Sequence, residues 1–188
     1  MNAEIFWSEA SSDLKKKFIG SLNYRTRCSM RKCSKTEKSL VDSCPLHLSQ
    51  LKLVIDTCHV RLHILASDDF PVLIHYHKHQ MGCKLKIIWK NTLQEKCLEN
   101  EHFLKTALRD FAILTRQRKL IVEDFFVITC LEESYLKELK RVMTSPEQKI
   151  ETSKFRFVGD VDHTDEFASF IDWRLVEYQK PIASQIPG

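Results

Sequence analysis

The sequence predicts an α+β protein: an N-terminal three-helix unit, then an antiparallel β-meander, then a short, curved and repeat-like β-α-β-α unit. Three observations lead to this class. Apolar residues recur at helical spacing in residues 11–44, and they alternate with polar residues, as in strands, across residues 51–89. Beyond residue 100, helical and strand-like segments take turns along the chain. We therefore divide the chain into a helical unit at 1–48, an α/β domain at 49–178 and a flexible tail at 179–188.

The first predicted helix begins after Ser11 or Ser12, either of which can act as its N-cap. Its apolar stripe lies beside an exposed run of lysines at 15–17 and consists of Leu14, Phe18, Ile19 and Leu22. A turn follows at Asn23. A second helix of two turns is predicted at 26–31, with Cys28 and Met30 as its apolar positions.

The third helix has the clearest start, because Ser34 and Glu37 fit a capping box. In this motif the Ser34 hydroxyl accepts the Glu37 backbone N–H, and the Glu37 carboxylate accepts the N–H of Ser34. The helix carries Leu40 and Val41 inward and ends before Pro45, whose ring disfavours a helical residue in front of it. Since roughly forty residues with few large apolar side chains bury little surface, we expect a partner protein to complete the unit.

Several stretches of this N-terminal unit follow one known pattern. They are Phe6-Trp7-Ser8-Glu9, the spacing of Leu14, Phe18, Ile19 and Leu22, the block at 24–31, and Cys33-Ser34-Lys35 leading to Leu40-Val41-Asp42-Ser43. On these residues the unit resembles the F-box of the large nematode F-box family. It departs from the family at Ala10-Ser11, where a Leu-Pro pair is usual, and at Glu37, where an aromatic residue is common.

The resemblance implies a non-catalytic substrate receptor of an SCF-type ubiquitin ligase. In such a receptor the F-box docks the Skp adaptor, and through it a cullin, while the rest of the chain recruits a protein target for ubiquitin-dependent degradation. A foreign or selfish-element protein is one target class that the family suggests. The residues expected to contact the adaptor are Trp7, Leu14, Phe18, Ile19, Leu22, Thr26, Arg27, Met30 and Arg31. For Thr26, Arg27 and Arg31, ordinary helix surface is the alternative.

Three or four antiparallel strands are predicted between residues 51 and 89. The segments are rich in β-branched and aromatic residues, and turn residues at 68–71 and 80–82 separate them; they are residues 51–55, 58–64, 72–77 and 83–89. One face of this sheet is expected to carry Val60, Leu62 and Ile64, and the opposite face His59, Arg61 and His63.

The chain then alternates between helix and strand. A helix is predicted from Asn100, its N-cap, to Leu114, and strands at 119–122 and 125–128 are separated by a bend or bulge at Glu123-Asp124. A further helix, ending before Pro146, has an apolar stripe of Tyr135, Leu136, Leu139, Val142 and Met143. A strand at 155–158 and a last short helix follow, the helix carrying Phe167, Phe170, Ile171 and Trp173. This order favours a parallel or mixed strand pair joined by a crossover helix.

Residues 132–173 resemble the opening of the FTH domain that follows the F-box in the same family. The resemblance rests on Tyr135-Leu136-Lys137-Glu138-Leu139, Thr144-Ser145-Pro146 and Phe155-Arg156-Phe157. Family members usually continue with more such units, so we expect a shortened target-binding surface. Its expected aromatic anchors are Phe167, Phe170 and Trp173, with inward packing against Phe155 and Phe157 as the alternative.

The formal net charge of +4 resides in the first fifty residues, which hold nine Lys or Arg against five Asp or Glu. We interpret this charge as solvated helix surface and expect no nucleic-acid partner, because interleaved aromatics and known binding motifs are missing. Seven cysteines, an odd number without a CxxC pair, are typical of free thiols in a reducing compartment. Since no apolar run reaches about 18 residues, we expect an intracellular protein of the cytoplasm or nucleus, with no membrane partner.

Histidines and cysteines gather in the predicted sheet, in an arrangement that could hold zinc; they are His75, His77, His79, His59, His63, Cys58 and Cys83. No pair of them has zinc-finger spacing, so we interpret the histidines as the polar outer side of a half-buried sheet and predict no metal site. Four glycines leave no phosphate-binding loop. No cofactor and no catalytic residue are predicted.

Two other functions stay open. The departures at Ala10-Ser11 and Glu37 would weaken adaptor docking, and the chain would then sequester a partner without assembling a ligase. A basic N-terminal surface would alternatively suit a nucleic-acid-binding module, for which binding to random DNA or RNA must weaken with salt. A pull-down of the adaptor separates the receptor from the sequestering module.

Overall fold

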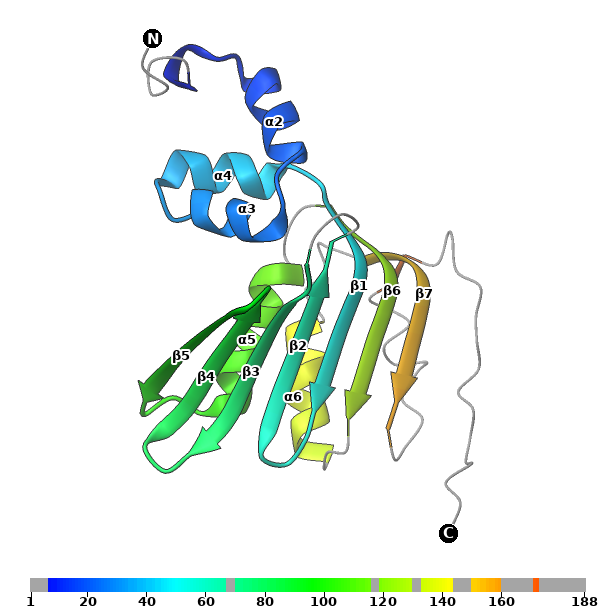
Figure 1. Ribbon diagram of the computed structural model, residues 1–188. Coiled ribbons are helices and arrows are strands. Elements are labelled where there is room, and N and C mark those ends of the chain that lie inside the picture. Colours follow the sequence, from blue (N-terminus) through cyan, green and yellow to red (C-terminus); the bar gives the residue numbers. More distant parts are fainter. Residues whose placement is uncertain are drawn as a thin grey trace.

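A computed structural model describes residues 7–66, 70–115, 119–129, 133–143, 150–159 and 171–172. This part of the chain includes three short helices, an eight-stranded mixed sheet, and two longer helices against one face of that sheet (Figure 1). The strand order is β5-β4-β3-β2-β1-β6-β7-β8. The predicted α+β class is thereby confirmed. None of the described helices is long and apolar enough to cross a membrane.

The N-terminal helices are α2 (Ser12–Gly20), α3 (Tyr24–Met30) and α4 (Lys35–Ser43). The sheet is built from β1 (Leu46–Ile55), β2 (His59–Leu65), β3 (Val72–His79), β4 (Gly82–Trp89), β5 (Thr92–Glu99), β6 (Leu120–Thr129), β7 (Ile150–Val158) and β8 (Ile171–Asp172). The helices against it are α5 (Phe103–Thr115) and α6 (Glu133–Met143).

Local side-chain caps explain where the three small helices begin. The Ser11 hydroxyl accepts the Leu14 N–H at 3.3 Å, as predicted. The second helix begins two residues earlier than predicted, because the Asn23 side chain accepts the Thr26 N–H at 2.8 Å and so caps α3. The sequence suggested only a turn at Asn23, although asparagine is a strong N-cap residue.

Half of the predicted capping box is present. The Ser34 hydroxyl accepts the Glu37 N–H at 3.1 Å, as expected for the N-cap of α4. The second half of the prediction is wrong, because the Glu37 carboxylate hydrogen-bonds the Ser34 hydroxyl and the Trp7 indole N–H instead of the Ser34 backbone. As predicted, α4 ends before Pro45, and Cys44 has an extended backbone (φ −88°, ψ 140°).

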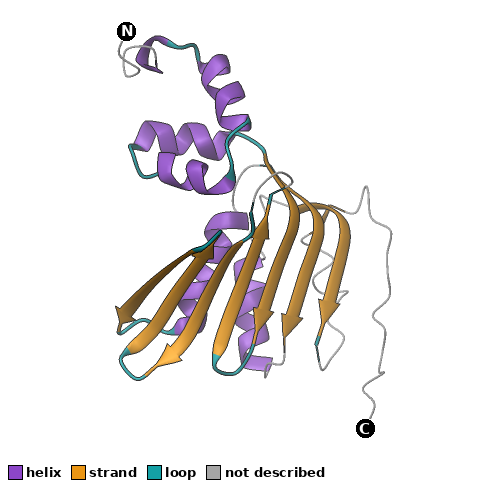
Figure 2. Cartoon of the chain, in the orientation of Figure 1, coloured by secondary structure: helices purple, strands orange, loops and turns teal. Residues whose placement is uncertain are grey.

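Five antiparallel strands, β1 to β5, form the meander (Figure 2), where the sequence predicted three or four. β1 begins at Leu46, five residues before the predicted start, because its backbone already pairs there with β6. β5 was missed because its side chains are mostly exposed and do not alternate. It is an edge strand held by pairing with β4 and by ion pairs from Lys84 and Lys86 to Glu95 at 2.9 and 3.0 Å.

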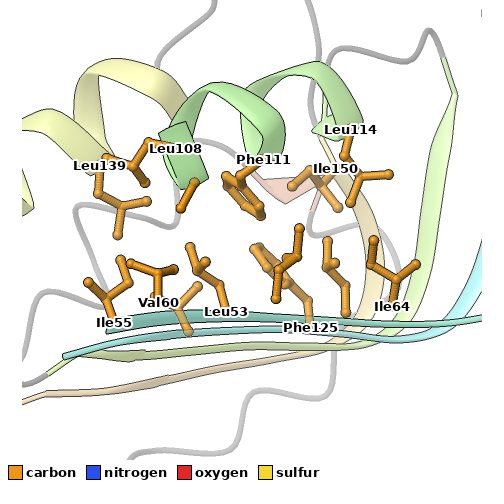
Figure 3. Packing of buried hydrophobic residues seen from close by; sticks show 14 of the residues in the cluster. Leu53, Ile55, Val60, Ile64, Leu108, Phe111, Leu114, Phe125, Leu139 and Ile150 are labelled. Carbon is orange, nitrogen blue, oxygen red and sulfur yellow. The ribbon is translucent and has the colours of Figure 1, made fainter. Parts of the chain in front are cut away.

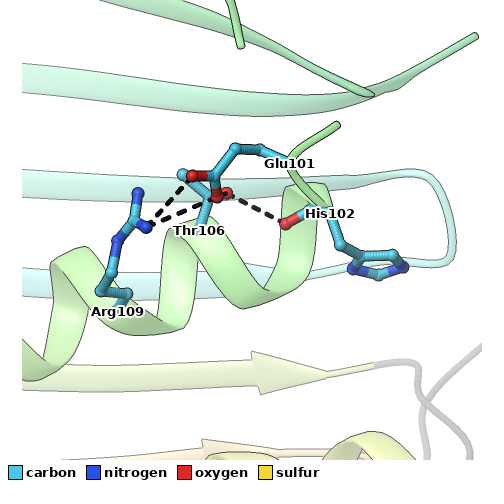
Figure 4. A network of polar contacts seen from close by, with 4 residues as sticks. All are labelled: Glu101, His102, Thr106 and Arg109. Carbon is cyan, nitrogen blue, oxygen red and sulfur yellow. Dashed lines mark hydrogen bonds and ion pairs between the residues drawn. The ribbon is translucent and has the colours of Figure 1, made fainter. Parts of the chain in front are cut away.

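The predicted helix after the meander is present as α5, but Asn100 is not its N-cap. Asn100 has a positive φ of 59° and donates its N–H to the Met81 carbonyl at 2.9 Å, so it belongs to the end of the β-ladder. At the start of α5, the Thr106 hydroxyl bonds the Glu101 carboxylate and the His102 carbonyl, both at 3.0 Å, and Arg109 pairs with Glu101 (Figure 4). These contacts tie the first turns of α5 to the chain that precedes them.

The strands β6 and β7 are parallel, as predicted for a pair joined by a helix, and β6 also lies parallel to β1. The expected break at Glu123-Asp124 does not interrupt β6. Instead, Glu123 and Asp124 are two successive residues that are not buried, so the buried side chains of β6 move from even-numbered to odd-numbered positions. The same shift occurs in β1 at 49–50 and in β7 at 153–154. Because Gln50 pairs with Asp124 and Asp124 with Lys154, these three shifts form one row across the sheet.

At the far edge of the sheet, Ile171 and Asp172 pair in parallel with β7 as strand β8. The sequence predicted a helix at this point, and the fully buried, β-branched Ile171 explains why a strand forms instead. Phe167, Phe170 and Trp173, the predicted target-binding residues, lie outside the described residues.

One main core holds the sheet and its two helices together. Phe111 of α5 stacks on Phe125 of β6 with ring centroids 6.3 Å apart, and both rings are fully buried (Figure 3). Leu139 of α6 lies above the same core, close to Ile55 in the view of Figure 3. Both α5 and α6 lie on one face of the sheet (Figures 1 and 2). Among the described residues, no helix covers the opposite face, which we name the outer face.

Candidate docking surfaces

The three small helices share a core of their own. Ile19, Val41 and Cys44 are buried there. Trp7, Leu22, Met30 and Leu40 pack around them and remain partly exposed. Of the predicted adaptor contacts, Ile19 is therefore an interior residue with no exposed surface, because the i+5 position of its stripe turns it toward α4. Leu22 and Met30 can present only part of their side chains to a partner.

The remaining apolar residues of the stripe face solvent. Leu14 and Phe18 are 48% and 51% exposed, one helical turn apart on α2. The Trp7 ring meets Phe18 edge-on with centroids 5.7 Å apart, and Lys15 Nζ lies 5.7 Å from the Trp7 centroid. We name Trp7, Leu14 and Phe18 the α2 patch. Such clustered apolar side chains on a surface commonly mark a site where another protein binds.

Beside the α2 patch lies an open depression of about 600 Å³ between α2 and α4. Its walls are mostly polar: Ser12, Lys15, Lys35, Thr36, Ser39, Leu40 and Ser43. Lys15 belongs to both surfaces, since it also contacts Trp7. A partner seated on the α2 patch would thus meet basic and hydroxyl side chains at its rim.

Arg27 was predicted to contact a partner, but the structure places it in the interior, 5% exposed. Its guanidinium donates hydrogen bonds to the carbonyls of Leu22 (3.2 Å), Gly20 (3.2 Å) and Pro45 (2.6 Å). It therefore ties the end of α2 to the segment that enters β1. Burial lowers the pKa of the Arg27 guanidinium, which stays charged because arginine titrates far above neutrality.

The other two members of that predicted group differ in exposure. Arg31 pairs with Asp42 at 2.6 Å and so links α3 to α4. Thr26 is exposed on the first turn of α3. Only Thr26 is thus freely available to a partner in the isolated chain.

The helical unit also contacts the sheet. The Arg25 guanidinium of α3 lies 4.2 Å from the centroid of the Trp89 ring on β4, and Tyr24 packs against the main core. Between α3 and the strands β3 to β5 is a cleft of about 250 Å³; it is lined by Tyr24, Arg25, Cys28, Ser29, Lys32, Val72, Ile74, Ile87, Trp89, Thr92 and Gln94. Burial raises the pKa of both Tyr24 and Cys28, so the thiol is not activated as a nucleophile.

The outer face of the sheet is rich in histidine, as the alternation of β2 predicted. Val60, Leu62 and Ile64 are buried, whereas His59, Arg61 and His63 point the other way and are half-buried. In the adjacent strand, His77 stacks on His59 and His75 on His63, with ring centroids 5.9 and 6.3 Å apart. The same face carries Lys52, Lys84, Lys86 and Arg156.

Three of these histidines have a lowered pKa, which favours the neutral form; in His77 the cause is burial, followed by the charge of His59. Burial, followed by the charges of Lys52 and Arg61, lowers the pKa of His63. Burial, followed by His63, lowers the pKa of His75. In contrast, Cys83, which the sequence placed with the histidines as a zinc candidate, is buried in the core on the opposite face. It cannot share a site with them.

A scan against protein-family models, a search of the curated proteins and a search of the solved structures each found no match to this chain.

Proposed function

We propose that this chain is a non-catalytic substrate receptor of an SCF-type ubiquitin ligase. The three-helix unit docks a Skp adaptor, and through it a cullin, while the α/β part recruits a protein target for ubiquitination. The observation that carries the proposal is the α2 patch, where Leu14 and Phe18 leave about half of their surface exposed. Because the same helices have an F-box-like sequence, we expect the Skp adaptor to cover this patch.

The adaptor contacts in this proposal are Trp7, Leu14, Phe18 and Thr26, with Leu22, Met30 and Arg31 at the margin. An apolar residue that is half exposed in the free chain gains buried area when a partner covers it, at about 25 cal/mol per Å². Aromatic residues at the centre of an interface contribute most of its binding energy. Phe18, supported by the Trp7 ring, is therefore the expected anchor.

A pull-down with the purified Skp adaptor tests this docking surface. We expect Leu14→Glu with Phe18→Glu to abolish capture, because each change places a charge in an apolar contact. The matched control is Met81→Glu, which puts the same charge on another exposed apolar residue, 61% exposed, at the β3–β4 turn. Capture that survives the double change, in a protein whose circular dichroism is unaltered, would show that the adaptor does not use this surface.

The target surface belongs to the α/β part of the chain. Phe167, Phe170 and Trp173 remain the proposed aromatic anchors, and the part of the outer face around Lys52, Arg61 and the histidines offers a second area. A protein with an acidic surface suits the lysines, arginines and histidines of that face. The receptor would act in the cytoplasm or nucleus, where ubiquitin ligases of this class work.

Loss of adaptor binding would leave a different function, in which the chain holds a partner without ligase assembly. The outer face also favours a nucleic-acid-binding module as a second candidate, since Lys52 of β1 and Arg61 of β2 lie on the same face of two paired strands, beside His63. Fluorescence anisotropy with a random RNA or DNA strand separates the two. Binding that weakens steeply with salt supports the nucleic-acid module, and binding to neither supports the sequestering role.

A further inference from the structure

We propose that the β1–β2 hairpin is a binding site for a divalent transition-metal ion of the zinc class, with Asp56, Cys58 and His59 as its ligands.

The ligand atoms of the three side chains lie close together at the β1–β2 turn. One atom from each lies within 4.8 Å of the other two. His59 Nδ1 is 3.4 Å from Cys58 Sγ, and His59 Nε2 is 3.6 Å from Asp56 Oδ2, so the two neighbours meet different nitrogens of the ring, of which only one can bind a given ion. In a tetrahedral zinc site with bonds of about 2.0–2.3 Å, ligand atoms are roughly 3.3–3.8 Å apart. Closing the site requires a rotation of the Asp56 or His59 side chain that brings Asp56 Oδ2 to the same ring nitrogen as Cys58 Sγ, from a starting separation within 4.8 Å.

The hairpin holds these residues in place through its backbone. Asp56 N–H bonds the His59 carbonyl at 2.9 Å, and Lys78 N–H of the neighbouring strand bonds the Cys58 carbonyl at 2.8 Å. The Thr57 N–H and hydroxyl both donate to Asp56 Oδ1, at 2.6 and 3.1 Å. This leaves Asp56 Oδ2 for a metal. Hydrogen bonds to the second oxygen are the usual support of a ligating carboxylate.

A water molecule is the expected fourth ligand. His77 pairs with His59 across β2 and β3, and their rings are stacked with an interplanar angle of 29°. Because stacked rings direct their in-plane nitrogen lone pairs side by side and not toward one ion, His77 is not counted as a ligand, and a water molecule would complete four-coordination. Cys58 is exposed, so a metal can reach its sulfur, and binding would release the thiol proton to solvent.

A second cysteine–histidine pair lies on the same face of the sheet and serves as the control. Cys97 Sγ lies 3.8 Å from His79 Nδ1, at the end of strands β5 and β3. Among the described residues, no carboxylate joins them to form a group of three within reach of one ion. Thiol and imidazole are thus equally present there, but the third ligand is missing.

Titration of the full chain with Co²⁺ under reducing conditions tests the site, because cobalt replaces zinc and reports its ligands by absorption. We expect saturation at one equivalent, with a thiolate-to-cobalt charge-transfer band and the visible bands of a tetrahedral ion. Zn²⁺ should displace the cobalt and remove these bands. Cys58→Ser should remove the charge-transfer band, and Asp56→Asn and His59→Ala should each weaken binding at least about tenfold.

Cys97→Ser and His79→Ala are the matched controls and should leave the titration unchanged. A charge-transfer band that survives Cys58→Ser, or that disappears with Cys97→Ser, would overturn the assignment. So would a titration of the wild-type chain that shows no saturable absorption. Cys58 lies on an exposed turn, so its substitution keeps the fold, which circular dichroism checks.

Discussion

The guanidinium of Arg27 satisfies three backbone carbonyls from two segments that are distant in the sequence. The sequence suggested a partner contact, because a charged residue on a short helix is usually at the surface. The periodicity of α2 did predict that Ile19 lies on an apolar stripe. No local pattern could show that the carbonyl of Pro45 returns to the end of α2, since this contact exists only after the helices have packed.

Arg27→Met should therefore destabilise the chain. Three hydrogen bonds from a charged donor are lost and the carbonyls stay partly buried, so we expect the free energy of unfolding to fall by about 2–3 kcal/mol. Urea unfolding followed by circular dichroism measures this. Lys17→Met, on the exposed side of α2, is the control and should change stability by less than about 0.5 kcal/mol. Equal stability of both variants would show that the Arg27 bonds are not structural.

At the scale of single elements, side-chain alternation predicted which face of β2 is buried and which carries the histidines. It failed for β5, whose residues are exposed on both faces as an edge strand, with Leu93 57% exposed. It also failed at Ile171, where pairing with β7 outweighed the helical spacing of the neighbouring aromatic residues. In both cases the information lies in the partner strand, which the local sequence does not contain.

The histidines of the outer face should make stability depend on pH. The pKa values of His63, His75 and His77 are lowered in the folded chain, whereas all three are about 6.5 in the unfolded chain. The unfolded state therefore binds more protons as the medium becomes acidic, and the stabilisation present above about pH 6.5 is lost below it. Urea midpoints measured from pH 8 down to about pH 5 should fall through this window.

A His63→Gln, His75→Gln double variant gives the control for this effect. Glutamine keeps hydrogen-bonding capacity but cannot take up a proton, so the slope of stability against pH should flatten between about pH 6.5 and 5. Lys52 and Arg61 face His63, and Arg61, His59 and His77 face His75, so the double variant leaves the contribution of His77 in place. An unchanged slope in the variant would show that other groups control the acid response.

In the whole molecule, the helical unit and the sheet are joined by more than the chain that links them. Arg25 stacks on Trp89, and Tyr24 packs against the main core. The sequence predicted a domain boundary at residue 48. This division falls inside β1, which begins at Leu46, because the backbone of residues 46–48 already pairs with β6.

These contacts lead us to expect one cooperative unfolding transition. Helical circular dichroism, which reports mainly on the helices, and tryptophan fluorescence, to which Trp89 contributes, should give the same urea midpoint. Trp89→Ala removes the stack with Arg25 and should lower the midpoint or separate the two signals. Two separate transitions in the wild-type chain would mean that the helical unit folds independently of the sheet.

The central claim is that the three-helix unit binds a Skp adaptor. Isothermal titration of the purified full chain with the purified adaptor measures this most directly. We expect saturable binding of one adaptor per chain with a Kd of about 1 μM or tighter, equivalent to at least about 8 kcal/mol of binding free energy. No saturable heat with about 100 μM adaptor, at two temperatures to exclude a chance zero enthalpy, would contradict the claim.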